Sequence, residues 1–422
     1  MKKSLLLALL FLTFCFAESL LAGSAPLNDW KPYAQREALE PEFDQEEESG
    51  TLILRSSGSF RCNGSWRRVY AIEENQFYGF EVEYRAERVA LIRRSVLVKV
   101  DWIGADGRRV GYPDYPSNLV DRGSGWQRLS EVIRAPEGAT AAQVDLILRW
   151  DSEGEVRWRN ASFQSAAPPA QRKVKLATVN HRPQSSTGPR QNLEEFSRFV
   201  EMAADKGADI VCLPEGVTIV GTGKTYLEVA EPVPGPSTKF LGALAKRRSV
   251  NILAGLIERD GKTCYNIAVL IGRDGSFVGK YRKVSLPREE IEGGLTPGSE
   301  FPVFDLDFGR VGILICWDIQ FPEGARRLAD RGAEVILLPI WGGQEALYTA
   351  RSIENQVYLV TSSYDSTTGI WSPKGELLSE ATDSGSIAVT EVDLAAETYW
   401  EWLGNLRWRI PRESPPVGES RP

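Results

Sequence analysis

The hydrophobic pattern of the chain changes character near residue 170. Between residues 50 and 164, apolar and polar side chains alternate in short segments separated by turn residues. Val96–Trp102 (VLVKVDW) is one such segment, and Asp106-Gly107 follows it as a hairpin signal. Val144–Trp150 and Val156–Trp158 repeat the alternation. Many short alternating segments predict an all-β sandwich or barrel, with Trp102, Trp150 and Trp158 in its core.

A different pattern begins after the Pro/Ala-rich residues 166–172. Continuous apolar runs, typical of buried strands, now alternate with segments of helical period, and this order predicts an α/β domain. The predicted strands cover residues 173–180, 210–213, 252–256, 266–271, 311–316 and 335–338. The predicted helices cover residues 191–206, 239–248, 323–331 and 345–356.

The N-terminus reads as an export signal. Met1-Lys2-Lys3 precedes the apolar run Leu5–Ala17, and small residues follow at Ala22 and Ala25. This layout is typical of a cleaved secretory signal peptide, and the run is shorter than the roughly 20 residues of a membrane-spanning helix. We therefore expect a secreted or periplasmic protein with no integral membrane span after signal removal.

These patterns divide the chain into five parts. The expected parts are a signal peptide at 1–25, a β-sandwich domain at 26–165, a linker at 166–172, an α/β domain at 173–410 and a flexible tail at 411–422.

Composition narrows the possible chemistry. The chain carries 50 Lys and Arg against 57 Asp and Glu, a net charge of −7, which disfavours a nucleic-acid-binding protein. It contains one histidine, His181, so a metal site built on two or three histidines is excluded. We expect no metal and no cofactor, and catalysis by carboxylate, lysine and cysteine. His181 itself is expected to be a satisfied polar residue.

Among the cysteines, Cys316 is the candidate for a catalytic nucleophile. It ends the apolar run Val311–Ile315 and is followed by Trp317-Asp318 and the helix-start signal Phe321-Pro322-Glu323. A cysteine at such a strand-to-helix elbow can present its sulfur and the next backbone N–H to a substrate. The alternative is a small apolar core residue, the usual fate of a free cysteine and the role expected of Cys212 and Cys264.

Two further segments support a catalytic role for Cys316. Val211–Gly216 (VCLPEG) delivers Glu215 at the end of a buried strand, and Tyr281–Pro287 (YRKVSLP) contains Lys283. Together with residues 290–298 (EIEGGLTPG), 351–355 (RSIEN) and 371–375 (WSPKG), these motifs resemble the nitrilase superfamily of carbon-nitrogen hydrolases, in the family's order, from about Val174 to Arg409.

The resemblance implies a four-layer α-β-β-α sandwich and a Glu-Lys-Cys site. In this reading Glu215 takes the thiol proton, and Cys316 attacks the carbon of a small-molecule amide-type substrate to form a thioester. Lys283 and the backbone N–H of Trp317 stabilise the developing negative charge.

A second glutamate between the lysine and the cysteine is also implied. Glu289, Glu290 and Glu292 are present, and Glu292 is favoured, with Glu290 as the alternative. The chain departs from common family wording at Ser285, where histidine is usual, and at Gln320, so the substrate is not implied.

The N-terminal domain resembles the galactose-binding-like β-sandwich of carbohydrate-binding modules through Gly125–Leu129, Ala135–Ala139 and the strands above. Glycan binding, with Tyr112–Tyr115 as an exposed aromatic platform, is one possible role; a spacer or an oligomer contact is another. We also expect a homo-oligomer.

The sequence thus predicts an exported thiol hydrolase that cleaves a small non-peptide C–N bond in an amide or N-carbamoyl compound. Nitrile hydrolysis by the same site, or a non-catalytic binding protein on a hydrolase scaffold, are the alternatives.

Overall fold

The computed structural model describes residues 30–400 and 403–413, and these divide into two compact units. The β-sandwich unit comprises residues up to 168 together with residues near 403–404 and 411–413. The α/β unit comprises residues 169–400 and 405–410. The expected signal peptide at 1–25 lies outside the described residues.

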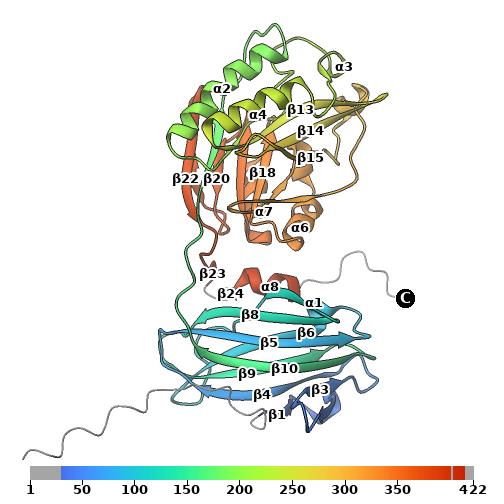
Figure 1. Cartoon of the computed structure of the whole chain (residues 1–422), viewed down its shortest axis with the longest axis vertical. Helices are drawn as coiled ribbons and strands as arrows, with labels where there is room; N and C mark the ends of the chain where they lie inside the picture. The colour runs from blue at the N-terminus through green and yellow to red at the C-terminus, as the bar shows by residue number, and fades with distance from the viewer. Residues whose placement is uncertain (1–29, 401–402, 414–422) are drawn as a thin grey trace, which may run out of the picture. The chain divides into compact units, whose positions relative to one another are not determined.

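The β-sandwich unit consists of two antiparallel sheets (Figure 1). One sheet has the strand order β1 (Lys31–Ala34), β4 (Asn63–Ala71), β9 (Ala139–Arg149), β6 (Val96–Gly104). The other has the order β2 (Glu42–Gln45), β3 (Leu52–Arg55), β10 (Glu155–Ser165), β5 (Phe77–Glu87), β8 (Trp126–Arg134), β7 (Asn118–Gly123). The short helical turns η2 (Glu37–Leu39) and α1 (Ile92–Ser95) complete the unit.

Alternation along the strands builds the core of this unit. Trp102 on β6 and Trp158 on β10 are fully buried, as expected from the sequence. Trp150 is an exception, because it lies one residue beyond β9 with a φ of +54° and is 39% exposed. The guanidinium groups of Arg94 and Arg149 lie over its ring. The prediction that Trp150 is a core residue is therefore wrong, since the strand ends before it.

Two further expectations change at residues 112–117 and at the C-terminus. Tyr112 and Tyr115 are both partly buried, and Gly404 packs against Tyr112, so they do not form a freely exposed platform. The expected flexible tail begins inside helix α8 (Leu406–Glu413). Arg412 on this helix is buried and donates hydrogen bonds to the backbone oxygen of Pro116 and to Ser117. Residues 414–422 lie outside the described residues.

The α/β unit contains two larger sheets. The first has the order β15 (Phe277–Arg282), β14 (Thr263–Ile271), β13 (Asn251–Asp260), β12 (Ile210–Cys212), β11 (Lys173–Asn180), β22 (Ser386–Asp393). The second has the order β16 (Val303–Leu306), β17 (Gly309–Ile313), β18 (Val335–Ile340), β19 (Tyr358–Ser363), β20 (Gly369–Trp371), β21 (Leu377–Glu380). The short strands β23 (Tyr399–Trp400) and β24 (Gly404–Asn405) pair near the C-terminus.

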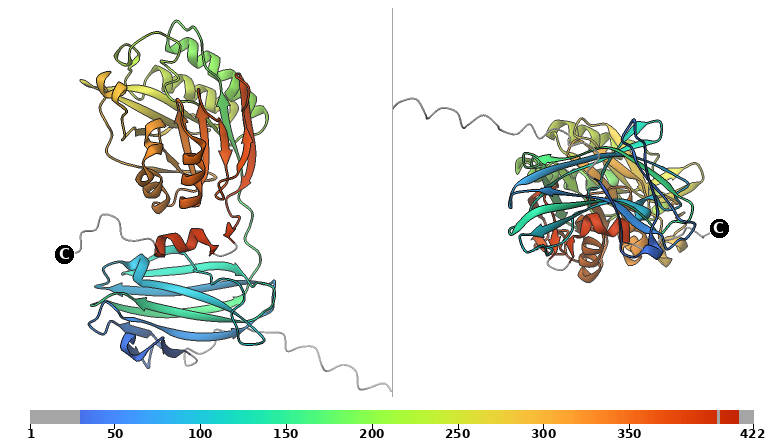
Figure 2. Two further views of the ribbon diagram at one scale, coloured as in Figure 1. Left: turned by 180° about the vertical axis from the view of Figure 1, so that it is seen from behind. Right: turned by 90° about the horizontal axis from the view of Figure 1, so that it is seen from below.

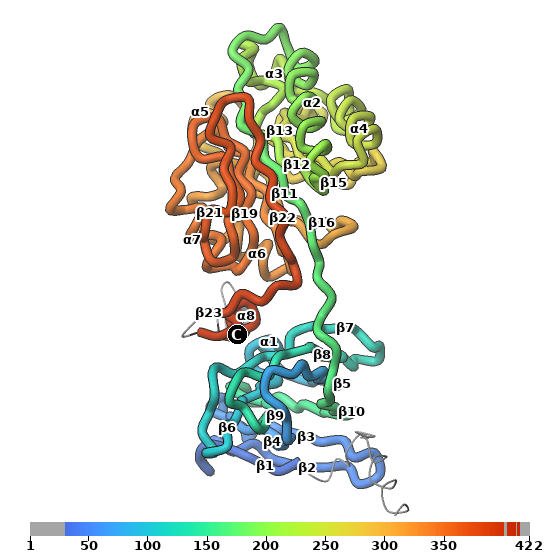
Figure 3. The backbone as a smooth tube through the Cα atoms, turned by 90° about the vertical axis from the view of Figure 1, so that its left-hand side faces the viewer, coloured from blue at the N-terminus to red at the C-terminus, as the bar shows by residue number. Residues whose placement is uncertain are grey.

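Strands from the two ends of this unit pair with each other. β11, the first strand, and β22, near the end, run antiparallel along their full lengths, and Figure 3 shows them side by side. β11 pairs in parallel with β12, and β12 with β13. The carboxyl ends of β12 and β13 therefore meet at one edge of the first sheet.

Helices cover the outer faces of both sheets. α2 (Pro189–Asp205) and α4 (Pro236–Arg248) lie side by side and pack through apolar residues on the first sheet (Figures 1 and 2). α6 (Pro322–Asp330) packs on the second sheet, where Leu328 lies against Gly312, and α7 (Glu345–Asn355) lies beside it. The short helices α3 (Tyr226–Val229) and α5 (Arg288–Glu292) lie in connecting segments.

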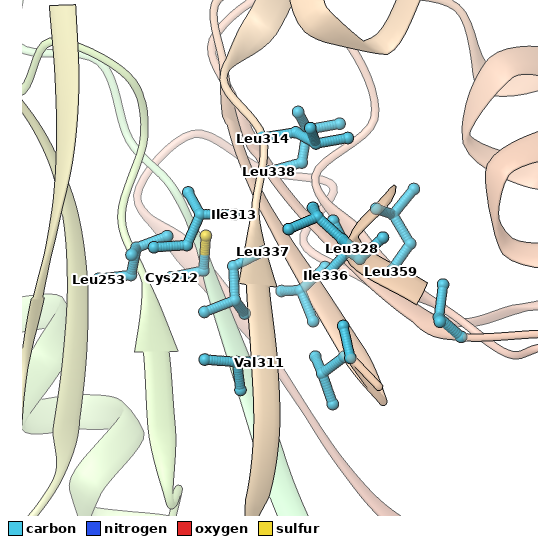
Figure 4. Packing of buried hydrophobic residues seen from close by; sticks show 14 of the residues in the cluster. Cys212, Leu253, Val311, Ile313, Leu314, Leu328, Ile336, Leu337, Leu338 and Leu359 are labelled. Carbon is cyan, nitrogen blue, oxygen red and sulfur yellow. The ribbon is translucent and has the colours of Figure 1, made fainter. Parts of the chain in front are cut away.

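An apolar layer joins the two sheets. Figure 4 shows Cys212 and Leu253 of the first sheet facing Ile313 and Leu337 of the second, and all four are fully buried. Leu314, Leu338 and other alternate residues of the second sheet point the opposite way, toward the α6 side. The order helix, sheet, sheet, helix confirms the expected four-layer sandwich. Within the described part of the chain, no helix is long and apolar enough to span a membrane.

Candidate active site

Three strand ends deliver the residues singled out from the sequence. Glu215 follows β12, Lys283 follows β15, and Cys316 begins the 3₁₀ turn η3 (Cys316–Gln320) after β17. β12 and β15 run in the same direction within the first sheet, so their carboxyl ends lie at one edge. The apolar layer between the sheets brings the end of β17 to the same place.

Lys283 lies at the centre of the site. Its side chain is completely buried, and its Nζ is 2.9 Å from Glu215 Oε1 and 2.5 Å from Glu290 Oε1. Burial alone would lower the pKa of Lys283, but the charges of Glu215 and Glu290 outweigh this effect and raise it. The lysine is therefore a permanent buried ammonium held by two carboxylates.

Glu290, and not Glu292, is the second glutamate beside the lysine. Glu290 is 5% exposed, and burial, together with the charge of Glu215, raises the pKa of its carboxyl against the opposing effect of Lys283. The side chain of Glu292 is 61% exposed and pairs with Arg288 on the protein surface. The choice of Glu292 from the sequence is corrected because residues two apart on a helix point in nearly opposite directions.

Cys316 has a strained backbone and a neutral thiol. Its φ is +44°, a left-handed conformation that non-glycine residues rarely adopt and that turns the chain sharply after β17. Burial, and then the negative charge of Glu215, raise the pKa of the thiol to about 12, while Lys283 and the backbone N–H of Trp341 oppose the rise. The thiol therefore needs a base, and the carboxylate of Glu215 is near enough to raise its pKa.

Asp318 joins the cysteine turn to the lysine segment. This carboxylate is 1% exposed. Its Oδ2 accepts hydrogen bonds from Tyr281 Oη at 2.8 Å and from the backbone N–H of Ile315 at 3.0 Å. Its Oδ1 accepts from the backbone N–H of Ser285 at 2.8 Å. Tyr281 and Ser285 flank Lys283, and Ile315 precedes Cys316, so one side chain sets the spacing between the two segments.

The position of Glu215 is set by close backbone packing. A Cβ atom at Gly255 on the neighbouring strand β13 would lie 2.6 Å from the Cα of Glu215, which only glycine avoids. The Tyr364 hydroxyl donates to the backbone oxygen of Glu215 at 2.9 Å. Both contacts restrain the carboxylate from the backbone side.

Other residues noted in the sequence have different places. His181 Nε2 lies 3.2 Å from Glu195 Oε2, and its ring packs on Phe196 and Phe199, as expected of a satisfied polar residue. Trp317 follows Cys316 in the first turn of η3, where backbone N–H groups have no partner inside the helix, and its side chain is 41% exposed. The buried Cys212 and Cys264 are core residues.

Asn266 and Asp318 were not assigned a role from the sequence. Asn266 lies on β14, and its side-chain amide contacts both glutamates beside Lys283. The sequence feature that could have identified Asn266 is that it is the one amide side chain in the otherwise apolar run after Tyr265. Asp318 lies two residues after Cys316, but nothing in the sequence pattern shows that Tyr281 and Ser285 donate hydrogen bonds to it.

Comparisons with known proteins identify the family of the α/β unit. The carbon-nitrogen hydrolase family matches residues 175–401. A nitrilase from Pyrococcus abyssi is 37% identical over 242 residues, covering 52% of this chain and 90% of that protein. The human omega-amidase NIT2 is 32% identical over 247 residues, covering 52% of this chain and 87% of that protein. The solved structure of Nit3 from Saccharomyces cerevisiae aligns with a TM-score of 0.48 and 24% identity, covering 60% of this chain and 98% of that chain.

The fold and the buried cluster define an α/β protein whose two central sheets meet at a Glu-Lys-Cys site. The chain belongs to the carbon-nitrogen hydrolase family, within the nitrilase superfamily. It is therefore an enzyme of the class that hydrolyses carbon–nitrogen bonds.

The link through Asp318 can be tested by substitution. We expect Asp318→Asn to lower the free energy of unfolding by about 2 kcal/mol, because the new amide would place a donor against the donors that Asp318 now satisfies. Chemical denaturation measures this change. The exposed Asp383 offers a control, and Asp383→Asn is expected to change stability by less than about 0.5 kcal/mol. Equal stability of the two variants would contradict the role given to Asp318.

Proposed function

We propose that this enzyme hydrolyses a small amide or N-carbamoyl compound through a thioester on Cys316. The observation that carries the proposal is the contact of Lys283 with both Glu215 and Glu290 beside a cysteine in a strained turn. The relatives named as omega-amidase and nitrilase support the reaction class. A relative named as an omega-amidase favours an amide-type substrate over a nitrile.

In the proposed reaction Glu215 takes the proton of the Cys316 thiol, and the sulfur bonds to the substrate carbonyl carbon. The carbonyl oxygen becomes an anion, stabilised by the Lys283 ammonium and the backbone N–H of Trp317. Collapse of this intermediate breaks the C–N bond, and Glu215 gives its proton to the leaving ammonia or amine.

The second half of the reaction returns the enzyme to its starting state. Glu215 takes a proton from water, whose oxygen attacks the thioester carbon. The carbonyl re-forms as the C–S bond breaks, and Glu215 returns the proton to the sulfur of Cys316. One carboxylate serves both halves because its proton is returned each time, and no cofactor is consumed.

An ammonia-release screen over amides, carbamoyl compounds and nitriles tests the substrate class. With a substrate in hand, Cys316→Ala should lower kcat by about 10⁴-fold or more, because no other group forms the acyl-enzyme. Lys283→Ala should lower kcat by about 10²–10³-fold, since its charge matters most once the oxyanion develops. Glu215→Gln should be nearly inactive while still binding substrate.

Two controls accompany these variants. Cys264→Ala removes another buried thiol, and His181→Ala removes the histidine; both should keep wild-type kcat. Full activity in Cys316→Ala would overturn the mechanism. Preference for nitriles would replace the substrate class and leave the mechanism standing, and no turnover with any compound would favour a non-catalytic binding protein.

The choice between the two glutamates gives a separate prediction. We expect Glu290→Gln to lower kcat/KM by about 10²-fold, because Lys283 loses one of its two buried counter-charges. Glu292→Gln removes only a surface ion pair with Arg288 and should change kcat/KM by less than about twofold. Steady-state kinetics of the two variants measures the contrast. A large loss in Glu292→Gln alone would restore the original choice.

We also propose that the protein is exported, with residues 1–25 as a cleaved signal. Support comes from the charged start, the apolar run and the small residues that follow it. Protein isolated from its native host should begin between Glu18 and Pro26 and be found outside the cytoplasm. Intact-mass measurement checks the N-terminus, and Met1 retained in the soluble cell fraction would contradict the proposal.

A further inference from the structure

Asn266 makes the same contacts as the catalytic lysine. Its Nδ2 donates to Glu215 Oε1 at 2.7 Å and to Glu290 Oε1 at 3.1 Å. These are the two oxygens that lie 2.9 and 2.5 Å from Lys283 Nζ. Two carboxylate oxygens are thus shared by one ammonium and one amide nitrogen in a closed, buried ring of four contacts.

The orientation of the amide is determined by this ring. Asn266 is 3% exposed, and its Oδ1 has no hydrogen-bond partner among the described residues. Exchanging the oxygen and nitrogen of the amide would place Oδ1 against two carboxylate oxygens and leave the donor unused. An unpartnered buried acceptor is unfavourable, so the two hydrogen bonds donated by the amide nitrogen, and not a contact of its oxygen, fix the orientation of the side chain.

We propose that Asn266 is a positioning residue that fixes which carboxylate oxygen of Glu215 and of Glu290 contacts Lys283. It holds Oε1 of each on Lys283 and so leaves the other oxygen of Glu215 to the thiol of Cys316. The second oxygen of Glu290, Oε2, is likewise buried without a partner in the described chain. This inference rests on the proposed function, since it assigns the proton-accepting atom of that reaction.

A neutral donor suits this position. Glu215 and Glu290 carry two potential negative charges against the single positive charge of Lys283. A second cation at position 266 would neutralise the cluster and weaken Glu215 as a base, and an added carboxylate would repel both glutamates. An amide donates two hydrogen bonds without changing the net charge, so it favours the ionised carboxylates but lowers their basicity less than a second cation would.

Removing the amide should alter the pH dependence of the site. Without its two hydrogen bonds the carboxylates bind a proton more readily, and the acidic limb of activity moves to higher pH. Among the described residues, the titratable groups that interact within or with the cluster include Glu215, Tyr226, Lys283, Glu290, Cys316, Asp318, Tyr348 and Tyr364. Asn266 is the member of the cluster that can be changed without removing a charge.

The test follows alkylation of Cys316 by iodoacetamide as a function of pH, with the modified residue located by mass spectrometry. In the full chain carrying Asn266→Ala, the acidic limb of the alkylation rate should move up by about one pH unit. In the presence of substrate, kcat should fall by about tenfold to a hundredfold, with KM changed by less than about threefold.

Asn251→Ala is the matched control. Asn251 is also a buried asparagine of the first sheet, at the start of β13, and its amide donates to the backbone oxygen of Asp209 while its oxygen accepts from Arg273. It lies outside the cluster, so its variant should lose stability and keep the wild-type pH profile. An equal shift in both variants would mean that the effect is only structural.

Asn266→Asp provides a second, isosteric variant should Asn266→Ala not fold. An ionised carboxylate there cannot donate a hydrogen bond and repels both glutamates, so the acidic limb of activity and alkylation should move to higher pH in this variant too. Wild-type pH profiles in both Asn266 variants would overturn the inference. Because alkylation needs no substrate, a shifted profile without ammonia release would refute the proposed function and leave the positioning role intact.

Discussion

The burial of one ammonium group between two carboxylates is the constraint around which the α/β unit is organised. Lys283 is completely removed from solvent, and a charge in that position is strongly destabilising unless its partners are in place. Glu215 lies 68 residues before Lys283 in the sequence. Glu290 lies seven residues after it, on the separate short helix α5. The cluster therefore forms only when the ends of β12 and β15 in the first sheet and helix α5 are correctly packed.

The scaffold around the cluster restrains each member through its backbone. Gly255 allows β13 to approach the Glu215 segment closely, and the Tyr364 hydroxyl donates a hydrogen bond to the backbone oxygen of Glu215. Asp318 ties the residues that flank Lys283 to the turn that carries Cys316. The strained φ of Cys316 is tolerated because this network leaves the turn few alternatives. Strand ends and buried hydrogen bonds thus restrain the connecting segments that carry the site residues.

The electrostatic balance of the site explains why it can work without histidine. The thiol of Cys316 is neutral because burial and Glu215 raise its pKa, so the unreacted enzyme stores a proton on sulfur and a base beside it. Lys283 keeps its charge because of the surrounding carboxylates. In the proposed reaction this arrangement supplies a base, a nucleophile and a fixed positive charge, with Lys283 Nζ 2.9 Å from Glu215 Oε1.

The sequence by itself determined the order of strands and helices and the positions of Glu215, Lys283 and Cys316. Glu215 and Cys316 follow apolar runs, whereas Lys283 follows a strand of mixed character. All three were singled out because their motifs together resemble a known family. Tertiary structure alone decided between Glu290 and Glu292, since both occupy the five-residue helix α5 and are separated by about 200° around its axis. It also revealed Asn266 and the partners of Asp318, and it placed Trp150 at the surface and Arg412 in a buried contact. These outcomes depend on contacts between residues far apart in the chain, which the period of a single segment does not encode.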